Sequence, residues 1–198
     1  MKAVLMSIQP KWCELIASGK KTVEVRKTKP KFETPFKCYI YCTKGKDWLT
    51  SVNGVVNKLN EIVIDLKASS KIQELNGKVI GEFVCDYVID SPIWRLRGNT
   101  GFLAPRTERE KNLPEMACLT LDELKEYVGS KNKCVCGWHI SNLVIYDKPR
   151  ELGEFEIVGC QGCRDKDTCH CKFHCFGRRT LKRPPQNWCY VEEVNDGT

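Results

Sequence analysis

Alternation of apolar and polar residues predicts that this chain is built mainly from β-strands. The clearest alternation runs over 79–89, where Val79 and Phe83 share one side and Glu82 lies on the other. Such a pattern is typical of a strand with one buried and one polar face. Further strands are predicted over 2–8, 20–27, 36–43, 136–146 and 188–192, the last of them closing the fold.

Helical spacing first occurs near the N-terminus. After Pro10, the apolar residues Trp12, Leu15 and Ile16 recur at positions i, i+3 and i+4, and Gly19 is a typical helix stop. We therefore expect a short amphipathic helix that leads directly into the next predicted strand.

Two further helices are expected. Thr120 and Glu123 have the spacing of a capping box, which predicts a helix over 121–128. Apolar residues over 47–67 recur at roughly helical spacing, so we interpret this stretch as a helical insertion. Strands interrupted by short helices predict one mixed α+β domain over 1–198, built on a twisted, mainly antiparallel sheet or barrel.

The composition is that of a chain with one buried core and no membrane segment. Its 198 residues are 41% hydrophobic and 29% charged, which is enough for one well-buried domain. No stretch reaches the roughly 20 apolar residues of a membrane span, and the apolar run before Pro10, about six residues, is too short for a signal peptide. Because the 13 cysteines are also odd in number, we expect a cytoplasmic protein with reduced thiols.

Positive charge is concentrated in two separate segments. Residues 1–46 carry eleven Lys and Arg against three acids, a balance of +8, and residues 160–183 carry seven against two, a balance of +5. If folding brings these segments together, they form a basic face that attracts polyanions. The alternative is two solvated lysine-rich surfaces that point in different directions.

The candidate site follows the first helix. Lys21, Glu24 and Arg26 fall within one short strand, a grouping suited to holding a phosphate or polarising an amide. Strict alternation would put Lys21 on the opposite face from Glu24, so we expect a bend or bulge near Thr22. Like charge from Lys20 and Arg26 would lower the pKa of Lys21 toward that of a base or nucleophile, whereas Glu24 would hold it charged for recognition.

The same residues resemble a known family. The pattern Gly19-x-Lys21-x-x-Glu24-x-Arg26 matches the GxKxxExR signature of the ASCH domain family. The segments 7–12, 76–83, 137–143 and 183–191 also look like parts of its bacterial and phage members, in the expected order. This resemblance implies a PUA-like mixed or antiparallel β-barrel with short flanking helices. It further implies a cleft beside the first helix that binds RNA or a modified nucleoside.

The resemblance leaves other activities open. One bacterial branch of the family hydrolyses the amide of N4-acetylcytidine, which would give Lys21 and Glu24 catalytic roles with Arg26 beside them. That branch has a Thr where this chain has Glu24 and uses a further downstream acid, a position for which Glu115 is a candidate. Amide hydrolysis and RNA cleavage therefore stay as enzymatic alternatives. A third hypothesis is a zinc-stabilised adaptor that binds another protein.

Aromatic and basic residues elsewhere supply candidate contacts to nucleic acid. Bases stack on aromatic rings, and Trp94 with Arg97 lies in a stretch without clear periodicity. We expect Trp138 and Trp188 in the core and His139 in a structural role. The predicted nucleic-acid contacts are Lys20, Lys21, Arg26, Trp94, Arg97, Arg178 and Arg179.

A cysteine cluster near the C-terminus predicts a structural zinc site. Cys160 and Cys163 supply two thiolates from one turn, and Cys169 with Cys175 completes a tetrahedral set, Cys171 being an alternative ligand. The resulting zinc-knuckle-like insertion would occupy 160–176; the alternative is a group of unliganded thiols. The pair Cys134-Val-Cys136 is a weaker metal signal, because a single residue separates the two thiols.

Overall fold

The computed structural model describes residues 2–31, 33–45, 49–52, 55–58, 72–96, 99–102, 105–129, 134–158 and 179–194. Contacts divide the chain into two compact units. Unit 1 comprises Met1–Glu14, Phe36–Phe83 and Leu143–Thr198, and unit 2 comprises Leu15–Pro35 and Val84–Asn142. Because the chain passes between the units several times, neither is a continuous segment, and a single domain stays a prediction. Among the described helices, none has the length and apolar character needed to cross a membrane.

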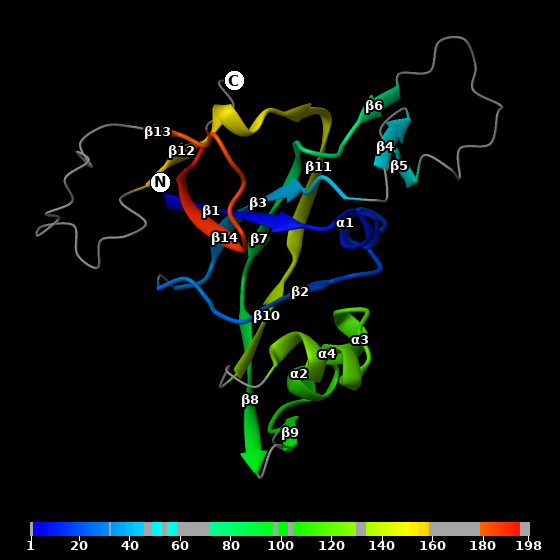
Figure 1. Ribbon diagram of the computed structural model, residues 1–198, viewed down its shortest axis with the longest axis vertical. Helices are drawn as coiled ribbons and strands as arrows, with labels where there is room; N and C mark the ends of the chain where they lie inside the picture. The colour runs from blue at the N-terminus through cyan, green and yellow to red at the C-terminus, as the bar shows by residue number, and fades with distance from the viewer. Residues whose placement is uncertain are drawn as a thin grey trace, which may run out of the picture. The chain divides into compact units, whose positions relative to one another are not determined.

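Unit 1 contains a seven-stranded sheet in the order β11-β7-β3-β1-β14-β12-β13 (Figure 1). β1 lies at its centre, parallel to β3 and antiparallel to β14. The strands are β1 Lys2–Ile8, β3 Phe36–Cys42, β7 Val79–Cys85, β11 Ser141–Arg150, β12 Glu156–Ile157, β13 Arg179–Thr180 and β14 Trp188–Glu192. The closing strand is therefore where the sequence predicted it.

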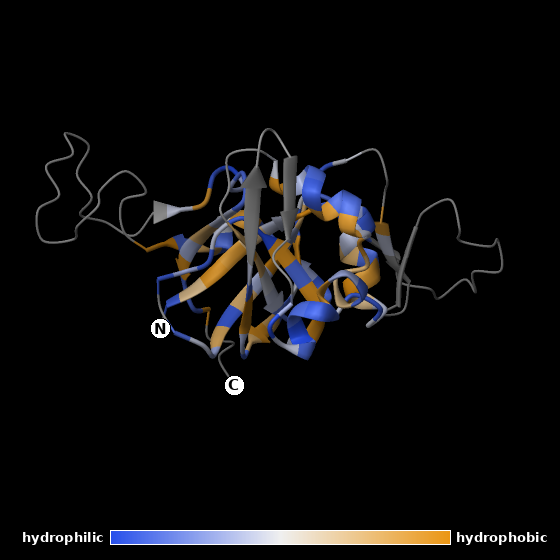
Figure 2. Cartoon of the chain, turned by 90° about the horizontal axis from the view of Figure 1, so that it is seen from below, coloured by the Kyte–Doolittle hydropathy of each residue, from blue (hydrophilic) through white to orange (hydrophobic). Residues whose placement is uncertain are grey.

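The core of unit 1 follows from continuous apolar runs in its central strands. Residues 3–6 of β1 are all buried, so both faces of this strand are covered. Tyr39 of β3 meets Phe155 edge to face, with ring centroids 4.8 Å apart. In Figure 2 the hydrophobic residues, coloured orange, lie mainly along strands, whereas the helices carry both colours.

The predicted helical insertion over 47–67 is wrong for its first half. Leu49–Val52 (β4) and Val55–Lys58 (β5) are antiparallel strands, and Ile72–Glu74 (β6) completes a three-stranded sheet in the order β5-β4-β6. Their β-branched residues suit a strand as well as they fit a helical spacing. Asn53-Gly54 between them is also the strongest short sequence signal for a hairpin. Residues 59–67 lie outside the described part of the chain.

Unit 2 contains a four-stranded antiparallel sheet in the order β2-β10-β8-β9. Its strands are β2 Val23–Arg26, β8 Val88–Leu96, β9 Asn99–Phe102 and β10 Cys134–His139. The helices are α1 Pro10–Ala17, whose last residues enter this unit, α2 Glu108–Lys111, α3 Leu113–Met116 and α4 Leu121–Val128. The predicted capping box is present, since the Thr120 side chain accepts from the Glu123 backbone and Glu123 accepts from the Thr120 backbone.

The two faces of this sheet differ in chemistry because side chains alternate along each strand. Val23, Val25, Ile89 and Val135 pack on one face against apolar residues of α3, α4 and the turn between them. The opposite face carries Glu24 and Arg26 of β2, Trp138 and Cys136 of β10, and Asp90 of β8. Glu24 and Arg26 thus lie on the sheet face opposite the valines that pack against the helices.

Several predicted boundaries shift. The strand predicted over 79–89 is two strands, β7 and β8, with a break at residues 86–87, and that predicted over 136–146 is β10 and β11, separated by Ile140. The described strands form three sheets and no closed barrel among them. The mixed α+β class is therefore shown, while the PUA-like barrel itself stays a prediction.

Gly137 provides a test of the packing between the unit 2 sheet and its helices. A Cβ atom at this position would lie 2.6 Å from Leu113 Cδ1 and 2.9 Å from Val23 Cγ1. We expect Gly137→Ala to lower the free energy of unfolding by about 1–3 kcal/mol through overpacking. Gly153→Ala is the control, because nothing lies within 4 Å of its added Cβ. Equal denaturation midpoints for the two variants would contradict the packing described.

Candidate functional site

The backbone at Lys21 explains how Lys21 and Glu24 meet. β2 begins only at Val23, so Lys21 precedes the strand and is not bound by its alternation. The Lys21 N–H donates to Leu15 O over 2.9 Å, and the Thr22 N–H donates to Met116 O over 2.9 Å. The irregular segment over 20–22, anchored at both of these points, replaces the predicted bulge.

Lys21, Glu24 and Arg26 converge and form what we term the charged cluster. The Lys21 Nζ lies 3.5 Å from Glu24 Oε2, and the Arg26 Nη2 lies 3.1 Å from Glu24 Oε1. Lys21 Nζ also donates a hydrogen bond of 2.7 Å to the carbonyl of Ala117. The three residues are only 2, 6 and 7% exposed. The sequence therefore predicted which residues meet, but the groups are buried rather than displayed on a surface strand.

Burial sets the electrostatics of the charged cluster. Removal from water lowers the pKa of Lys21, and the positive charge of Arg26 lowers it further. Glu24 opposes this by ion pairing and hydrogen bonding, and the nearby Cys118 thiol acts in the same direction. The pKa of Lys21 is thus lowered, as expected. The largest cause, however, is burial and not repulsion by neighbouring positive charges. Two cations share one carboxylate, which leaves the charged cluster with one excess positive charge.

Tyr127 and Ala117 belong to the site although no local sequence signal points to either. The phenol of Tyr127 in α4 hydrogen-bonds with Arg26, and desolvation raises the pKa of Tyr127 while the charge of Arg26 lowers it. Lys27 Nζ lies 4.9 Å from the centroid of the Tyr127 ring, which is 37% exposed as a residue. Both residues reach the charged cluster through tertiary packing from about a hundred positions away in sequence.

Cys118 lies beside the charged cluster in an uncommon backbone conformation. Its φ of 53° is in the left-handed region, which non-glycine residues adopt infrequently. Its thiol donates to the carbonyl of Lys20 over 3.3 Å. The Lys20 side chain itself is exposed. The turn after α3 is therefore attached at two consecutive residues, Ala117 and Cys118, to the segment that carries Lys20 and Lys21.

The predicted aromatic residues have different positions. Trp138 is fully buried, as expected, and lies directly opposite Glu24 across β2 and β10, so it packs on the same face as the charged cluster. Trp188 is half-buried and meets Tyr190 edge to face at 5.3 Å. Trp94 lies in β8, paired with Gly101 of β9. The side chain of Trp94 falls outside the described part of the structure.

Other predicted contacts also fall outside the described residues. Arg97 and Arg178 are not described, and Arg179 begins β13 without a described side chain. The predicted zinc ligands, with the alternative ligand, are Cys160, Cys163, Cys169, Cys175 and Cys171, all of which also lie outside the described residues. In the part of the chain that is described, no group of three or more His, Cys, Asp or Glu residues is arranged to hold a metal ion. The zinc site stays a prediction.

His139 is held in place, as expected for a structural histidine. Its Nδ1 lies 2.6 Å from Asp86 Oδ1, and its ring stacks on Tyr87 with centroids 4.3 Å apart. The guanidinium of Arg109 lies 3.9 Å from the centroid of the Tyr87 ring. Burial acts to raise the pKa of Asp86, but the hydrogen bond with His139 and the backbone hydrogen bonds of Asp86 and Tyr87 together lower it. These contacts give His139 a defined structural partner.

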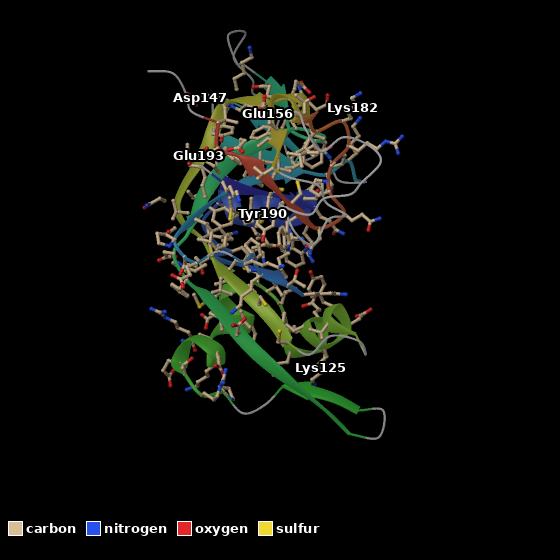
Figure 3. All side chains as sticks on the ribbon, turned by 90° about the vertical axis from the view of Figure 1, so that its left-hand side faces the viewer. Lys125, Asp147, Glu156, Lys182, Tyr190 and Glu193 are labelled. Atoms are coloured by element: carbon tan, nitrogen blue, oxygen red, sulfur yellow. The ribbon has the colours of Figure 1, made fainter. Side chains whose placement is uncertain are left out.

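Unit 1 has a polar network of its own. Lys37 Nζ lies 2.9 Å from Glu82 Oε1 and 3.3 Å from Glu193 Oε1, and the hydroxyl of Tyr146 donates to Glu82 over 2.6 Å. Glu193, which follows β14, is labelled in Figure 3. The network links side chains from β3, β7 and β11, which are neighbours in the large sheet. We interpret it as a cross-strand network of the sheet surface.

Comparison with known proteins identifies one family. The family model of the ASCH domain matches residues 6–91, a range that includes the whole charged cluster. Two similar solved structures come from Zymomonas mobilis. The crystal structure of ASCH has 15% identity, covers 76% of this chain and 73% of its own, and gives a TM-score of 0.45. The crystal structure of a tyrosine-to-phenylalanine mutant has 14% identity, covers 77% of each chain and gives a TM-score of 0.46. No curated protein matches the chain.

The lowered pKa of Lys21 predicts a pH-dependent stability difference. The folded protein binds fewer protons at Lys21 than the unfolded chain between the lowered pKa and the usual value of 10.5. The contribution of Lys21 to the free energy of unfolding therefore rises with pH between the lowered pKa and 10.5. Relative to a Lys21→Met variant, the wild type should gain free energy of unfolding as the pH rises from 7 toward 10.5, measured by urea denaturation at each pH.

The Lys21→Met comparison cancels the titration of the other groups that both proteins share. A difference in unfolding free energy that does not change with pH, or that moves in favour of Lys21→Met as the pH rises, would contradict a lowered pKa at Lys21.

Proposed function

We propose that this chain, whose residues 6–91 match the family model of the ASCH domain, binds RNA or a modified nucleoside through the charged cluster and the side chains around it. The observation that carries the proposal is the convergence of Lys21, Glu24 and Arg26, with one excess positive charge, beneath the partly exposed ring of Tyr127. The family match supplies the link to RNA.

Electrostatics supports an anionic ligand at this place. A charge surrounded by protein is screened less than one in water, so the excess charge of the cluster adds to the potential at the nearby surface. The exposed Lys20 precedes the cluster and the half-buried Lys27 follows it. A phosphate group beside β2 would therefore face two accessible ammonium groups above a positively charged interior.

Tyr127 offers the second component of nucleic-acid recognition. Its ring is held from one side by Arg26 and by the ammonium of Lys27, so little conformational entropy is lost when a base stacks on it. A ring that is 37% exposed retains surface for such a contact. Phosphate contacts at Lys20 and Lys27, with a base on Tyr127, would fit a single-stranded segment or one nucleotide.

The geometry gives less support to amide hydrolysis by Lys21 and Glu24. A catalytic amine has to lose its proton and approach the substrate. Lys21 Nζ instead donates to Ala117 O and faces the Glu24 carboxylate, and the residue is 2% exposed. These contacts favour a Lys21 that positions the turn after α3 and supplies charge, and for this reason we propose binding and not turnover.

The cysteine-rich segment completes the proposal. A zinc ion held by Cys160, Cys163, Cys169 and Cys175 would fix the segment that contains Arg178 and Arg179. These two arginines would extend the basic surface available to RNA in a cytoplasmic protein. Zinc is thus proposed as a structural ion without a part in chemistry.

The salt dependence of RNA binding tests the proposed function. Fluorescence anisotropy with a labelled single-stranded RNA should show affinity that falls linearly with salt on logarithmic axes. Lys20→Gln and Lys27→Gln should each reduce that slope by about 0.7, the value for one phosphate of a single strand. Tyr127→Ala should weaken binding by about 1–3 kcal/mol, the value of one stacked base, with a smaller change in slope.

Lys148→Gln is the matched control, because it removes one exposed lysine from β11 in unit 1. The proposal is wrong if binding is absent or insensitive to salt. The proposed location beside β2 is wrong if Lys148→Gln reduces the slope of affinity against salt as much as Lys20→Gln and Lys27→Gln do.

A further inference from the structure

Cys134 and Cys136 share one face of β10. They are two residues apart on a strand, so both side chains point to the face that carries Glu24 and Arg26. The expected Cα–Cα separation is about 6.6 Å for two strand residues, near the upper limit for a disulfide. The two Cβ atoms of a regular strand are about as far apart, whereas a disulfide needs about 3.5–4.5 Å between them. Bridging therefore requires the backbone to bend at Cys134, the first residue of β10, and the bond would be strained and easily reduced.

The two thiols differ in access. Cys136 is 2% exposed and buried between two strands, with Arg26 opposite it on β2 and Asp90 opposite it on β8. Cys134 lies at the start of the strand and is partly exposed. A small oxidant can therefore reach Cys134 from solvent, while Cys136 is available only to a neighbour within the fold.

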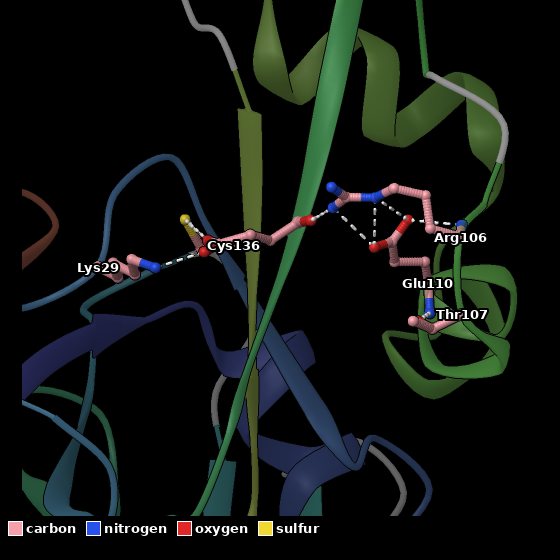
Figure 4. Close-up of polar contacts among 6 residues, drawn as sticks. Lys29, Arg106, Thr107, Glu110 and Cys136 are labelled. Carbon is pink, nitrogen blue, oxygen red and sulfur yellow. Dashed lines mark hydrogen bonds and ion pairs between the residues drawn. The ribbon is translucent and has the colours of Figure 1, made fainter.

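Charged groups are placed to assist chemistry at this pair. The Cys136 thiol donates to Asp90 Oδ1 over 3.4 Å, and the other oxygen of Asp90 pairs with Lys29 Nζ (Figure 4). The ammonium of Lys29 interacts electrostatically with both Cys134 and Cys136, so a cation lies beside the pair. Burial, followed by the charges of Cys134 and Asp90, raises the pKa of Cys136, so this residue remains a thiol.

Asp90 is fixed from its other side as well. Arg106 Nη2 donates to the Asp90 carbonyl over 3.1 Å, and the same guanidinium pairs with Glu110 at 2.9 Å. Figure 4 shows that Lys29 and Arg106 approach from opposite sides of the strands. The carboxylate that accepts the hydrogen bond of the Cys136 thiol is therefore held in register with that thiol.

We propose that Cys134 and Cys136 form a reversible oxidation site that reacts with hydroperoxides, with the accessible Cys134 as the attacking sulfur and the buried Cys136 as the resolving thiol. In the first step the Cys134 sulfur bonds to one oxygen of hydrogen peroxide as the O–O bond breaks, and the departing hydroxide is protonated to water. This leaves a sulfenic acid at Cys134.

In the second step the Cys136 sulfur attacks the Cys134 sulfur. The S–S bond forms, the S–O bond breaks, and the hydroxide leaves as a second water after protonation. The departing hydroxide takes up the proton of Cys136. The two thiols lose two electrons and two protons, and the peroxide is reduced to two water molecules. A thiol reductant restores the pair through exchange.

Tryptic mass spectrometry tests the site directly. Cleavage after Lys133 and Arg150 gives one peptide, residues 134–150, that contains Cys134 and Cys136 and no other cysteine. After peroxide treatment and alkylation, this peptide should carry no alkyl group and be lighter by two hydrogens than the reduced form. Dithiothreitol should restore two alkylation sites. Two alkylated cysteines after peroxide, or Cys134 linked to another peptide, would overturn the proposal.

Three variants assign the roles. Cys136→Ser should leave a sulfenic acid at Cys134 that dimedone traps, whereas Cys134→Ser should give no trapped Cys136. Asp90→Asn should lengthen the lifetime of the sulfenic acid by about tenfold or more, because the charge-assisted hydrogen bond that orients the Cys136 thiol is lost. Cys118→Ser, which removes a partly exposed thiol elsewhere in unit 2, should leave disulfide formation unchanged. Unaltered kinetics in Asp90→Asn would remove Asp90 from the mechanism, and trapping at Cys136 would reverse the assignment.

Discussion

The carboxylate of Glu24 is the constraint on which unit 2 depends. It lies between the ammonium of Lys21 and the guanidinium of Arg26, and all three groups are almost completely removed from water. An isolated buried charge costs several kcal/mol, so neither cation is tolerable at this place without Glu24. Lys21 also donates to the carbonyl of Ala117, which attaches the turn after α3 to the segment that precedes the edge strand β2. One side chain therefore holds together a strand and a helical turn that lie far apart in sequence.

The proposed binding function and the proposed oxidation site share one structural origin. Alternation along β2 and β10 directs valines to the helices and places Glu24, Arg26 and Cys136 together on the other face. Arg26 and Cys136 are directly opposite each other, and Cys136 is directly opposite Asp90. Charged and reactive side chains therefore lie in rows across three neighbouring strands, on the face opposite the valines.

The sequence predicted features that depend on local order. The Thr120 capping box, the stop at Gly19 and the strand over 188–192 are found as expected, because each is specified by residues close together in the chain. The family signature also identified Lys21, Glu24 and Arg26 as a group. Their burial, and the parts played by Ala117 and Tyr127, could not be predicted, since these depend on how distant segments pack. Over 49–58 the helical interpretation failed because apolar spacing was weighed above the Asn53-Gly54 turn signal.

A double-mutant cycle on Glu24 and Arg26 tests the compensated buried cluster most directly. The free energy of unfolding is measured for the wild type, Glu24→Gln, Arg26→Gln and the double variant. If the carboxylate compensates the guanidinium, the double variant loses less stability than the sum of the two single variants, with a coupling of about 1–3 kcal/mol. Losses that add to within about 0.5 kcal/mol would show that the two groups stabilise the fold independently, and would contradict the account.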